Sequence, residues 1–241
     1  IVPFGLPWEP PSIRVARLKE SIKLIRALWG STRQATVTFA GKFYQLKEAF
    51  LSQSPKQRPH PPIYIGAMGS RKALQVVGRF GDGWYPWLNT PETFRRRWLI
   101  IREAAESAGR SPKQIESVLH LMVAFPRNTT ERKNALTAAK STLIMEKSIL
   151  ASLGLKSPAH HYQNLAYLSE EEISKIVSAS EQVPDDIVYQ TMAIGGTDQV
   201  KERIDELTRV GARHFAIVDL LGPRTARRTL ALLRETIRDY R

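Results

Sequence analysis

Apolar residues along this chain alternate between the spacing of strands and the spacing of helices. Ile63–Ile65 is a short β-branched and aromatic run, which is typical of a buried strand. The next apolar stripe has helical spacing and consists of Ala73, Val76, Val77 and Phe80. Gly81 ends that helix, and Trp84–Trp87 begins another strand. The pattern therefore predicts a strand, a glycine turn, a helix and a second strand in succession.

The same alternation continues to the end of the chain. A helix from Ser12 to Trp29 and a small hairpin, Val37–Phe39 with Phe43–Leu46, come before the first buried strand. The later elements are a helix from Thr90 or Pro91 to Ala108, a strand over Val118–Phe125, helices over Thr130–Leu150 and Ser169–Ser180, a helix capped by Thr197 and closed by Gly211, a strand over His214–Leu220, and a terminal helix after Gly222-Pro223. Alternating strands and helices predict an α/β fold with a parallel sheet. Four such units fit an open doubly wound sheet or half of an eight-stranded barrel.

Composition narrows the class of protein further. The 241 residues are 42% hydrophobic and 24% charged, contain no cysteine, and carry a net charge of +13. No apolar run is long enough to cross a membrane and no signal peptide is visible, so we expect a cytoplasmic protein that does not contact a membrane. The basic residues are spread along helices without any nucleic-acid-binding motif, so we expect solvated faces, among them Arg95–Arg97, and no nucleic-acid partner. A polyanionic small-molecule cofactor accounts equally well for the charge.

The turn from Gly66 to Ser70 is the strongest candidate for chemistry. It follows a buried strand and precedes a helix N-terminus, where free backbone N–H groups and the positive end of the helix dipole suit a phosphate. Glycine at positions 66 and 69 permits close approach of the backbone to a ligand. A loop kept small only for packing explains the same residues, and local chemistry leaves both readings open.

Other polar residues give weaker signals. Adjacent His160 and His161 would point apart in a strand and have no third ligand at suitable spacing, so no metal site is predicted. Asp82 lies in the turn that leads into a strand, which favours a structural capping role. Asp219, near the end of the last strand, is a lesser pocket candidate.

Several segments, in order, resemble the bacterial-luciferase-like oxidoreductase superfamily. They are GLPWEP and RLKESIKLIRALW near the start, VTFAGKFYQL, PPIYIGAMGSRKALQVVGRFGDGWYPW, and GGTDQVKERIDELTRVGARHFAIV. The closer similarity is to the deazaflavin-dependent branch that includes methylenetetrahydromethanopterin reductase. The resemblance runs over nearly the whole chain.

This resemblance implies a TIM (β/α)8 barrel of which residues 1–241 supply the carboxy-terminal portion, strands five to eight. Residues 128–190 are then a helical insertion that covers the barrel mouth as a lid. The usual proton donors of the family belong to the first half, so no catalytic residue is assigned here. A half barrel exposes strand edges and an apolar sheet face. We therefore expect these residues to belong to a longer polypeptide or to form a homo-oligomer.

The resemblance also implies roles for individual residues. Gly66, Ala67, Met68, Gly69 and Ser70 match the turn whose amides hold the cofactor's phosphate, with Arg71 or Lys72 as further contacts. Trp87 and Asn89 follow the next strand on the face where barrel chemistry occurs, and are candidates for the substrate pocket. Core packing explains Trp87 equally well.

The resulting functional hypothesis is hydride transfer between a deazaflavin, coenzyme F420, and an organic small molecule, with methylenetetrahydromethanopterin as the favoured substrate. An FMN-dependent luciferase-like monooxygenase is the alternative within the same class. Two further alternatives are a non-oxidative barrel enzyme that binds a phosphorylated metabolite, and a non-catalytic remnant of the fold.

Overall fold

The computed structural model describes all residues except 1–4, 6, 147–149, 152–153, 155–168 and 239–241. The chain divides into two compact units. Unit 1 comprises Ile1–Trp84 and Leu99–Glu116, and unit 2 comprises Tyr85–Trp98 and Ser117–Arg241. Helix α3, Pro91–Glu106, contributes its first half to unit 2 and its second half to unit 1.

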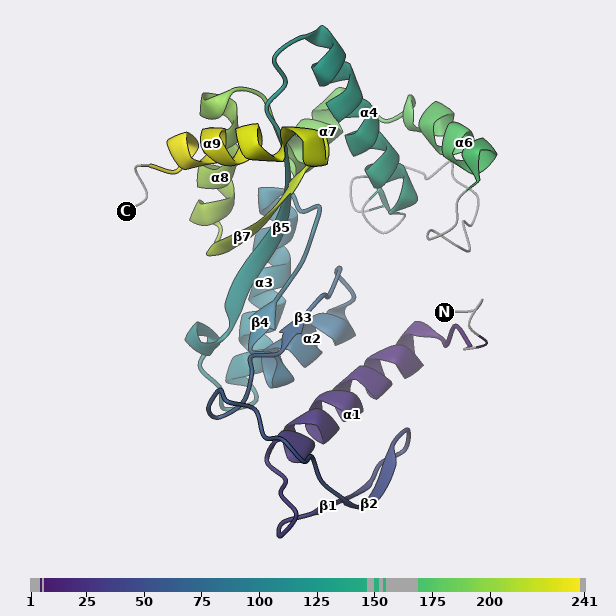
Figure 1. Ribbon diagram of the computed structural model, residues 1–241, viewed down its shortest axis with the longest axis vertical. Coiled ribbons are helices and arrows are strands. Elements are labelled where there is room, and N and C mark those ends of the chain that lie inside the picture. Colours follow the sequence, from purple (N-terminus) through teal and green to yellow (C-terminus); the bar gives the residue numbers. More distant parts are fainter. Residues whose placement is uncertain (1–4, 6, 147–149, 152–153, 155–168, 239–241) are drawn as a thin grey trace. The chain divides into compact units, whose positions relative to one another are not determined.

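Unit 1 combines a helix-supported hairpin with a strand–helix–strand motif (Figure 1). Its elements are α1 (Pro11–Trp29), β1 (Val37–Ala40), β2 (Gln45–Ala49), β3 (Tyr64–Ile65), α2 (Arg71–Phe80), β4 (Gly83–Trp84), the second half of α3, and the 3₁₀ turn η2 (Pro112–Gln114). Strands β3 and β4 are parallel, with Tyr64 opposite Gly83 and Ile65 opposite Trp84. The order strand, turn, helix, strand is confirmed, but β4 covers Gly83–Trp84 and not the predicted Trp84–Trp87. Proline occupies the first position of α1, as its fixed φ favours.

The hairpin of unit 1 differs from its predicted bounds because a side chain of α1 takes part in its turn. The Glu20 carboxylate accepts hydrogen bonds from the backbone N–H groups of Lys42, Phe43 and Tyr44 at 3.1, 2.7 and 2.8 Å. Those amides are therefore not available to a strand ladder, and β2 begins at Gln45 instead of Phe43. The hairpin is antiparallel, as predicted.

A carboxylate anchors the amino ends of β3 and β4. Asp82 accepts two hydrogen bonds from Nη2 of Arg26, at 2.9 and 3.0 Å, and one from the Ile63 backbone N–H at 2.9 Å. Arg110 adds a second guanidinium 3.8 Å away and donates to the carbonyls of Gly78 and Gly81. Asp82 thus ties a helix, a strand start and a turn together, which is the structural role that its sequence position favours.

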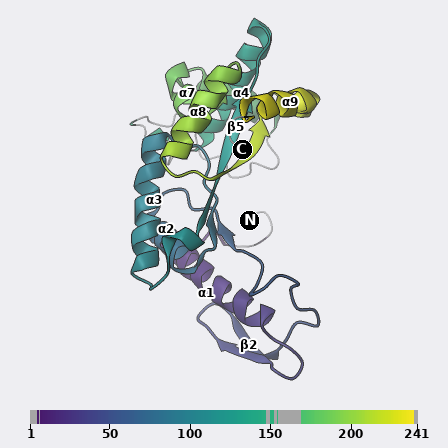
Figure 2. The same cartoon turned by 90° about the vertical axis from the view of Figure 1, so that its left-hand side faces the viewer.

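Unit 2 contains parallel strands with helices packed beside them (Figures 1 and 2). Its elements are the first half of α3, β5 (Glu116–Ala124), α4 (Thr129–Met145), α6 (Glu170–Ser180), α7 (Asp185–Thr191), β6 (Ala193–Ile194), α8 (Thr197–Arg209), β7 (His214–Asp219), η4 (Pro223–Thr225) and α9 (Ala226–Thr236). Strand β5 is parallel to β6 and to β7, so their carboxyl ends lie at one edge of this sheet. Helices α8 and α9 lie side by side in both views.

The core of unit 2 is organised around β5. Leu119, Leu121 and Val123 alternate along one face of the strand and are at most 1% exposed. Val118 and His120 point to the opposite face, where the paired residues of β7 are His214 and Ala216. The continuous apolar run in the sequence therefore reflects a strand covered on both faces over much of its length.

Helices of the 128–190 segment follow the sequence signals at their starts. The Asn128 side chain accepts from the Glu131 N–H, and α4 ends at Met145 instead of the predicted Leu150. The predicted capping box of α6 is present, with reciprocal hydrogen bonds of 3.2 and 2.8 Å between Ser169 and Glu172. Strand β6 is a further parallel strand that the pattern does not predict; its two residues are defined by their pairing with β5.

The Glu131 carboxylate connects three segments at the carboxyl edge of the unit 2 sheet. The Glu131 carboxylate accepts hydrogen bonds from Nη1 and Nη2 of Arg228 at 3.1 and 2.9 Å, and from the backbone N–H of Arg127 at 2.9 Å. These contacts, led by the Arg228 hydrogen bonds, lower the pKa of Glu131 to about 2. The α4 N-terminus is thereby tied to α9.

Replacement of Asp82 by Asn should destabilise the protein by about 2 kcal/mol, because Arg26 and Arg110 would be left half-buried without an anion. Urea unfolding monitored by circular dichroism measures this loss. The matched control is Glu106→Gln, which removes one negative charge from an exposed position of α3 and should change the unfolding free energy by less than about 0.5 kcal/mol. Equal stability of Asp82→Asn and the control would contradict the anchoring role.

Acid should remove the contribution of Glu131 in a defined pH range. Its folded-state pKa is lowered to about 2 from an ordinary 4.5, so its stabilisation is complete above pH 4.5 and is lost as the pH falls toward 2. The stability difference between the wild type and Glu131→Gln should therefore shrink across this interval. Chemical unfolding at several pH values measures it. Glu171→Gln, at an exposed pair with Lys175, should show a smaller pH-dependent change, and a constant Glu131→Gln difference would argue against the network.

Candidate functional site

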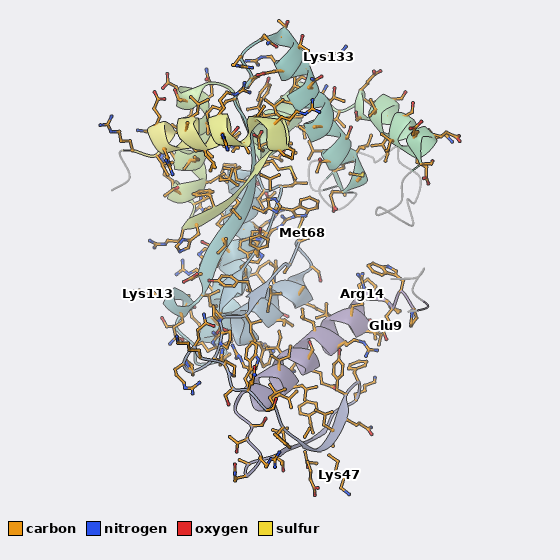
Figure 3. All side chains as sticks on the ribbon, viewed as in Figure 1. Glu9, Arg14, Lys47, Met68, Lys113 and Lys133 are labelled. Carbon is orange, nitrogen blue, oxygen red and sulfur yellow. The ribbon has the colours of Figure 1, made fainter. Side chains whose placement is uncertain are left out.

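The Gly66–Ser70 turn lies where the sequence predicts it, between the carboxyl end of β3 and the start of α2 in unit 1. Met68 is labelled on this loop in Figure 3. Gly66 and Ser70 are exposed, Met68 and Gly69 are partly exposed, and Ala67 is buried. Ala67 is therefore the one buried residue of the loop, and the residues on either side of it are accessible to solvent.

Hydrogen bonds at Ala67 orient the loop. Its N–H donates to the Ile65 carbonyl at 3.1 Å, and its carbonyl accepts from the indole Nε1 of Trp84 at 2.9 Å. In a trans peptide the carbonyl and the following N–H point in opposite directions. Because the Ala67 carbonyl points toward the buried Trp84, the Met68 N–H points away from it.

The amides that follow are available to a ligand. Within the described residues, no hydrogen bond joins the backbone N–H of Met68, Gly69 or Ser70 to another protein group. Gly69 has a φ of +129°, a conformation that L-residues with a side chain rarely adopt. The peptide geometry of this turn therefore depends on glycine at position 69.

The start of α2 has no protein cap of its own. Ser70 occupies the N-cap position with extended backbone, but its side chain accepts no hydrogen bond from the first turn, and that turn contains no acidic residue. Arg71 lies 3.9 Å from Glu103 on the surface. An unfilled helix N-terminus next to the free amides of the loop forms a cradle that suits an oxyanion.

Trp87 of unit 2 belongs to an aromatic cluster on β5. It forms an isolated parallel bridge with His120, and the two ring centroids lie 6.0 Å apart. The Tyr85 ring is 5.8 Å from His120 on the same face. The His120 Nε2 has no hydrogen-bond partner among the described residues, and burial lowers the pKa of this histidine. Nothing in the sequence pattern singles out this unpaired ring nitrogen.

Asn89, the second residue predicted for the substrate pocket, is buried, with only 1% of it exposed. Its Nδ2 donates to the Trp87 carbonyl at 2.9 Å, and its Oδ1 accepts from Nη1 of Arg97 at 2.6 Å.

Arg97 is the main residue that the sequence analysis placed wrongly. Arg95 and Arg96 are exposed, as predicted, whereas Arg97 is 6% exposed, and burial together with the Arg96 charge lowers its pKa. The signal was present in the spacing: Arg97 is three residues after buried Phe94 and four before buried Ile101, on the inner face of α3.

Asp219 is already engaged by the protein. Its carboxylate accepts from the hydroxyl groups of Thr225 and Thr229 at 2.6 and 2.7 Å and from the Leu221 N–H at 3.0 Å. These contacts hold the turn between β7 and α9, so the structure gives Asp219 a capping role in place of the pocket role that its position suggested.

Unit 2 also contains two cavities that the sequence does not indicate. One of about 370 Å³ lies along α4 and is also lined by Val177, Ser180, Glu181 and Asp185. Another of about 490 Å³ lies beside β6 and α8, with Arg203, Glu202 and Glu206 in its wall. Gly66–Ser70, Trp87 and Asn89 line neither of them.

The described residues contain neither a cluster of metal-ligand side chains nor a helix able to span a membrane. No three His, Asp or Glu side chains come together in a group that could hold a metal ion, and the predicted non-ligand pair His160-His161 lies outside the described residues. None of the described helices has the length and apolar character needed to cross a membrane.

Comparison with known proteins gives one family and several relatives. The family described as luciferase-like monooxygenase matches residues 2–214. The phthiodiolone/phenolphthiodiolone dimycocerosates ketoreductase of Mycobacterium bovis (strain BCG / Pasteur 1173P2) is 25% identical over 240 residues, 96% of this chain and 62% of that protein. The F420-dependent glucose-6-phosphate dehydrogenase of Nakamurella multipartita is 34% identical over 137 residues, 56% of this chain and 38% of that protein.

Solved structures show the same fold. An F420-dependent secondary alcohol dehydrogenase in complex with an F420-acetone adduct has a TM-score of 0.69 at 20% identity, over 89% of this chain and 58% of that one. The coenzyme F420-dependent tetrahydromethanopterin reductase of Methanopyrus kandleri has a TM-score of 0.67 at 19% identity, over 85% and 57%. The chain thus spans about three fifths of the length of these proteins. It has the α/β architecture of luciferase-like barrel enzymes over that part, and it belongs to the luciferase-like monooxygenase family.

Proposed function

We propose that the protein containing this chain is an oxidoreductase that uses a deazaflavin or flavin, and that the Gly66–Ser70 turn binds the cofactor's phosphate. The main support for this proposal is that the N–H groups of Met68, Gly69 and Ser70 donate no hydrogen bond to another described residue. They lie next to the N-terminus of α2, which has no side-chain cap. A phosphate oxygen accepts hydrogen bonds from such amides without requiring any side chain.

The names of the relatives support coenzyme F420 as the cofactor. Both the glucose-6-phosphate dehydrogenase and the secondary alcohol dehydrogenase are described as F420-dependent. The net charge of +13 also favours a cofactor with several negative charges. The family description, luciferase-like monooxygenase, supports FMN as the second candidate, with oxygen as the co-substrate.

When bound, the cofactor supplies the hydride chemistry. The residues of this chain hold its anionic tail through the main-chain amides of the turn, and the buried Trp84 keeps those amides oriented. In unit 2, Trp87 and Tyr85 offer flat apolar surface beside His120, which suits a substrate-pocket wall. No described residue is assigned as the proton donor.

For the substrate, we propose a small organic molecule reduced or oxidised at carbon. Methylenetetrahydromethanopterin is the finer proposal, and the similarity to the tetrahydromethanopterin reductase supports it. The ketoreductase and alcohol dehydrogenase names support a carbonyl–alcohol pair instead. We further propose that residues 128–190, which include α4, α6 and α7, act as an insertion that selects the substrate.

Cofactor binding tests the proposal directly. Purified protein should bind F420 more tightly than FMN, measured by equilibrium dialysis with the absorbance of each cofactor. Gly69→Ala should weaken F420 binding about tenfold, because a side chain at a φ of +129° forces the turn to change. The matched control is Gly109→Ala, at another positive-φ glycine (φ +69°) with open space around it, which strains the backbone without touching the turn.

A second ligand separates phosphate binding from ring binding. The deazaflavin without its phosphate should bind more weakly to the wild type, and Gly69→Ala should not weaken it further. If Gly69→Ala reduces the affinity for both ligands equally, or if neither F420 nor FMN binds, the phosphate role of the turn is wrong.

A further inference from the structure

Arg97 is a buried cation that the proposed cofactor site does not use. It is the only charged side chain in the buried class among the residues that the structure describes, at 6% exposure. Its polar partner there is the neutral Oδ1 of Asn89, and it forms no ion pair with a described carboxylate. A buried guanidinium without a counter-ion is strongly unfavourable, so an anion at this position would stabilise it.

The unused edge of this guanidinium has the shape for an oxyanion. Nη1 donates to Asn89, whereas Nε and Nη2 have no hydrogen bond within the described part of the chain. Nε and Nη2 of Arg97 are not among the fully buried side-chain atoms that lack a hydrogen-bond partner. Nε of Arg26 and Nε of Arg228 are such atoms. The parallel N–H groups of Nε and Nη2 match two oxygens of a carboxylate or phosphate.

The same edge is occupied by a carboxylate elsewhere in this protein. Arg17 donates from Nε to Oε2 of Glu9 at 2.9 Å and from Nη2 to Oε1 at 2.6 Å. Arg17 is on the surface and has its anion within the chain, whereas Arg97 is buried and has none among the described residues.

The surroundings hold Arg97 in place. The Asn89 amide is oriented by its own hydrogen bond to the Trp87 carbonyl, which directs Oδ1 toward Nη1 of Arg97. Thr90 caps the N-terminus of α3 by accepting from the Thr93 N–H. The residues that orient Arg97 follow β4 directly in the chain, and loops after strands carry the ligand sites of barrel enzymes.

We propose that Arg97, oriented by Asn89, binds the carboxylate or phosphate group of a small molecule in the loop that follows β4. This site is separate from the Gly66–Ser70 turn and does not depend on the cofactor assignment. In this arrangement Arg97 is a binding residue and Asn89 is its positioning residue.

Thermal unfolding with inorganic phosphate as the probe tests this site, at constant ionic strength set with chloride. Phosphate should raise the melting temperature of the wild type in a saturable way. Arg97→Gln should weaken the apparent affinity about tenfold or more, because it removes a charged hydrogen-bond donor pair. Arg95→Gln, at an exposed position of the same helix, is the matched control and should respond as the wild type does.

Asn89→Asp keeps the test decisive if Arg97→Gln does not fold. It places a carboxylate where Oδ1 of Asn89 now lies 2.6 Å from Nη1 of Arg97, so it supplies an internal anion. This variant should melt at a higher temperature than the wild type without phosphate and should respond less to phosphate.

Three results would overturn the proposal. One is a wild type whose melting temperature does not respond to phosphate beyond the chloride control. Another is an Asn89→Asp variant that is less stable than the wild type and keeps the full response. The third is a response that Gly69→Ala removes and Arg97→Gln leaves intact, because it would assign the phosphate to the other loop.

Discussion

The hydrogen bond from the Trp84 indole to the Ala67 carbonyl is the contact on which the candidate site depends. Trp84 is fully buried, so its N–H must find an acceptor inside the protein, and the loop supplies it. That bond holds the turn against β4 and leaves the N–H of Met68 facing away. At the amino ends of the same strands, Asp82 binds the Ile63 N–H. The β3–β4 pair is thus held at both ends, and the loop between β3 and α2 is presented on a rigid support.

Within the described part of the chain, three carboxylates have several hydrogen-bond donors each, whereas the buried cation Arg97 has no anionic partner. Asp82, Glu131 and Asp219 all lie near strand ends, and each is surrounded by donors from the chain itself. Their contacts serve the fold: they tie helices to strand ends and turns. Arg97 has only a neutral amide oxygen as its described partner. An external anion at this guanidinium would supply the counter-charge that the described residues do not provide.

Much of the fold could be predicted from local signals because those signals act over a few residues. The alternation of strand and helix periods predicted the parallel α/β arrangement. The Ser169–Glu172 pair predicted the start of α6, and the small residues Gly66–Ser70 predicted the turn between β3 and α2. Strand β6 escaped prediction because its partner, β5, lies about 70 residues earlier in the chain and only pairing defines it. The early end of α4 likewise has no local signal.

The candidate site was predictable in its backbone and not in its side chains. By itself, the sequence determined that a small-residue turn connects a buried strand to a helix, because glycine, serine and β-branched residues restrict the chain locally. Only the tertiary structure decided that Asn89 is buried against Arg97 and that His120 lies beside Tyr85 and Trp87. It also decided that the Asp219 carboxylate accepts hydrogen bonds from two threonine hydroxyls. The physical reason is that a polar side chain acquires its role from partners that the folding of distant segments brings within hydrogen-bond distance.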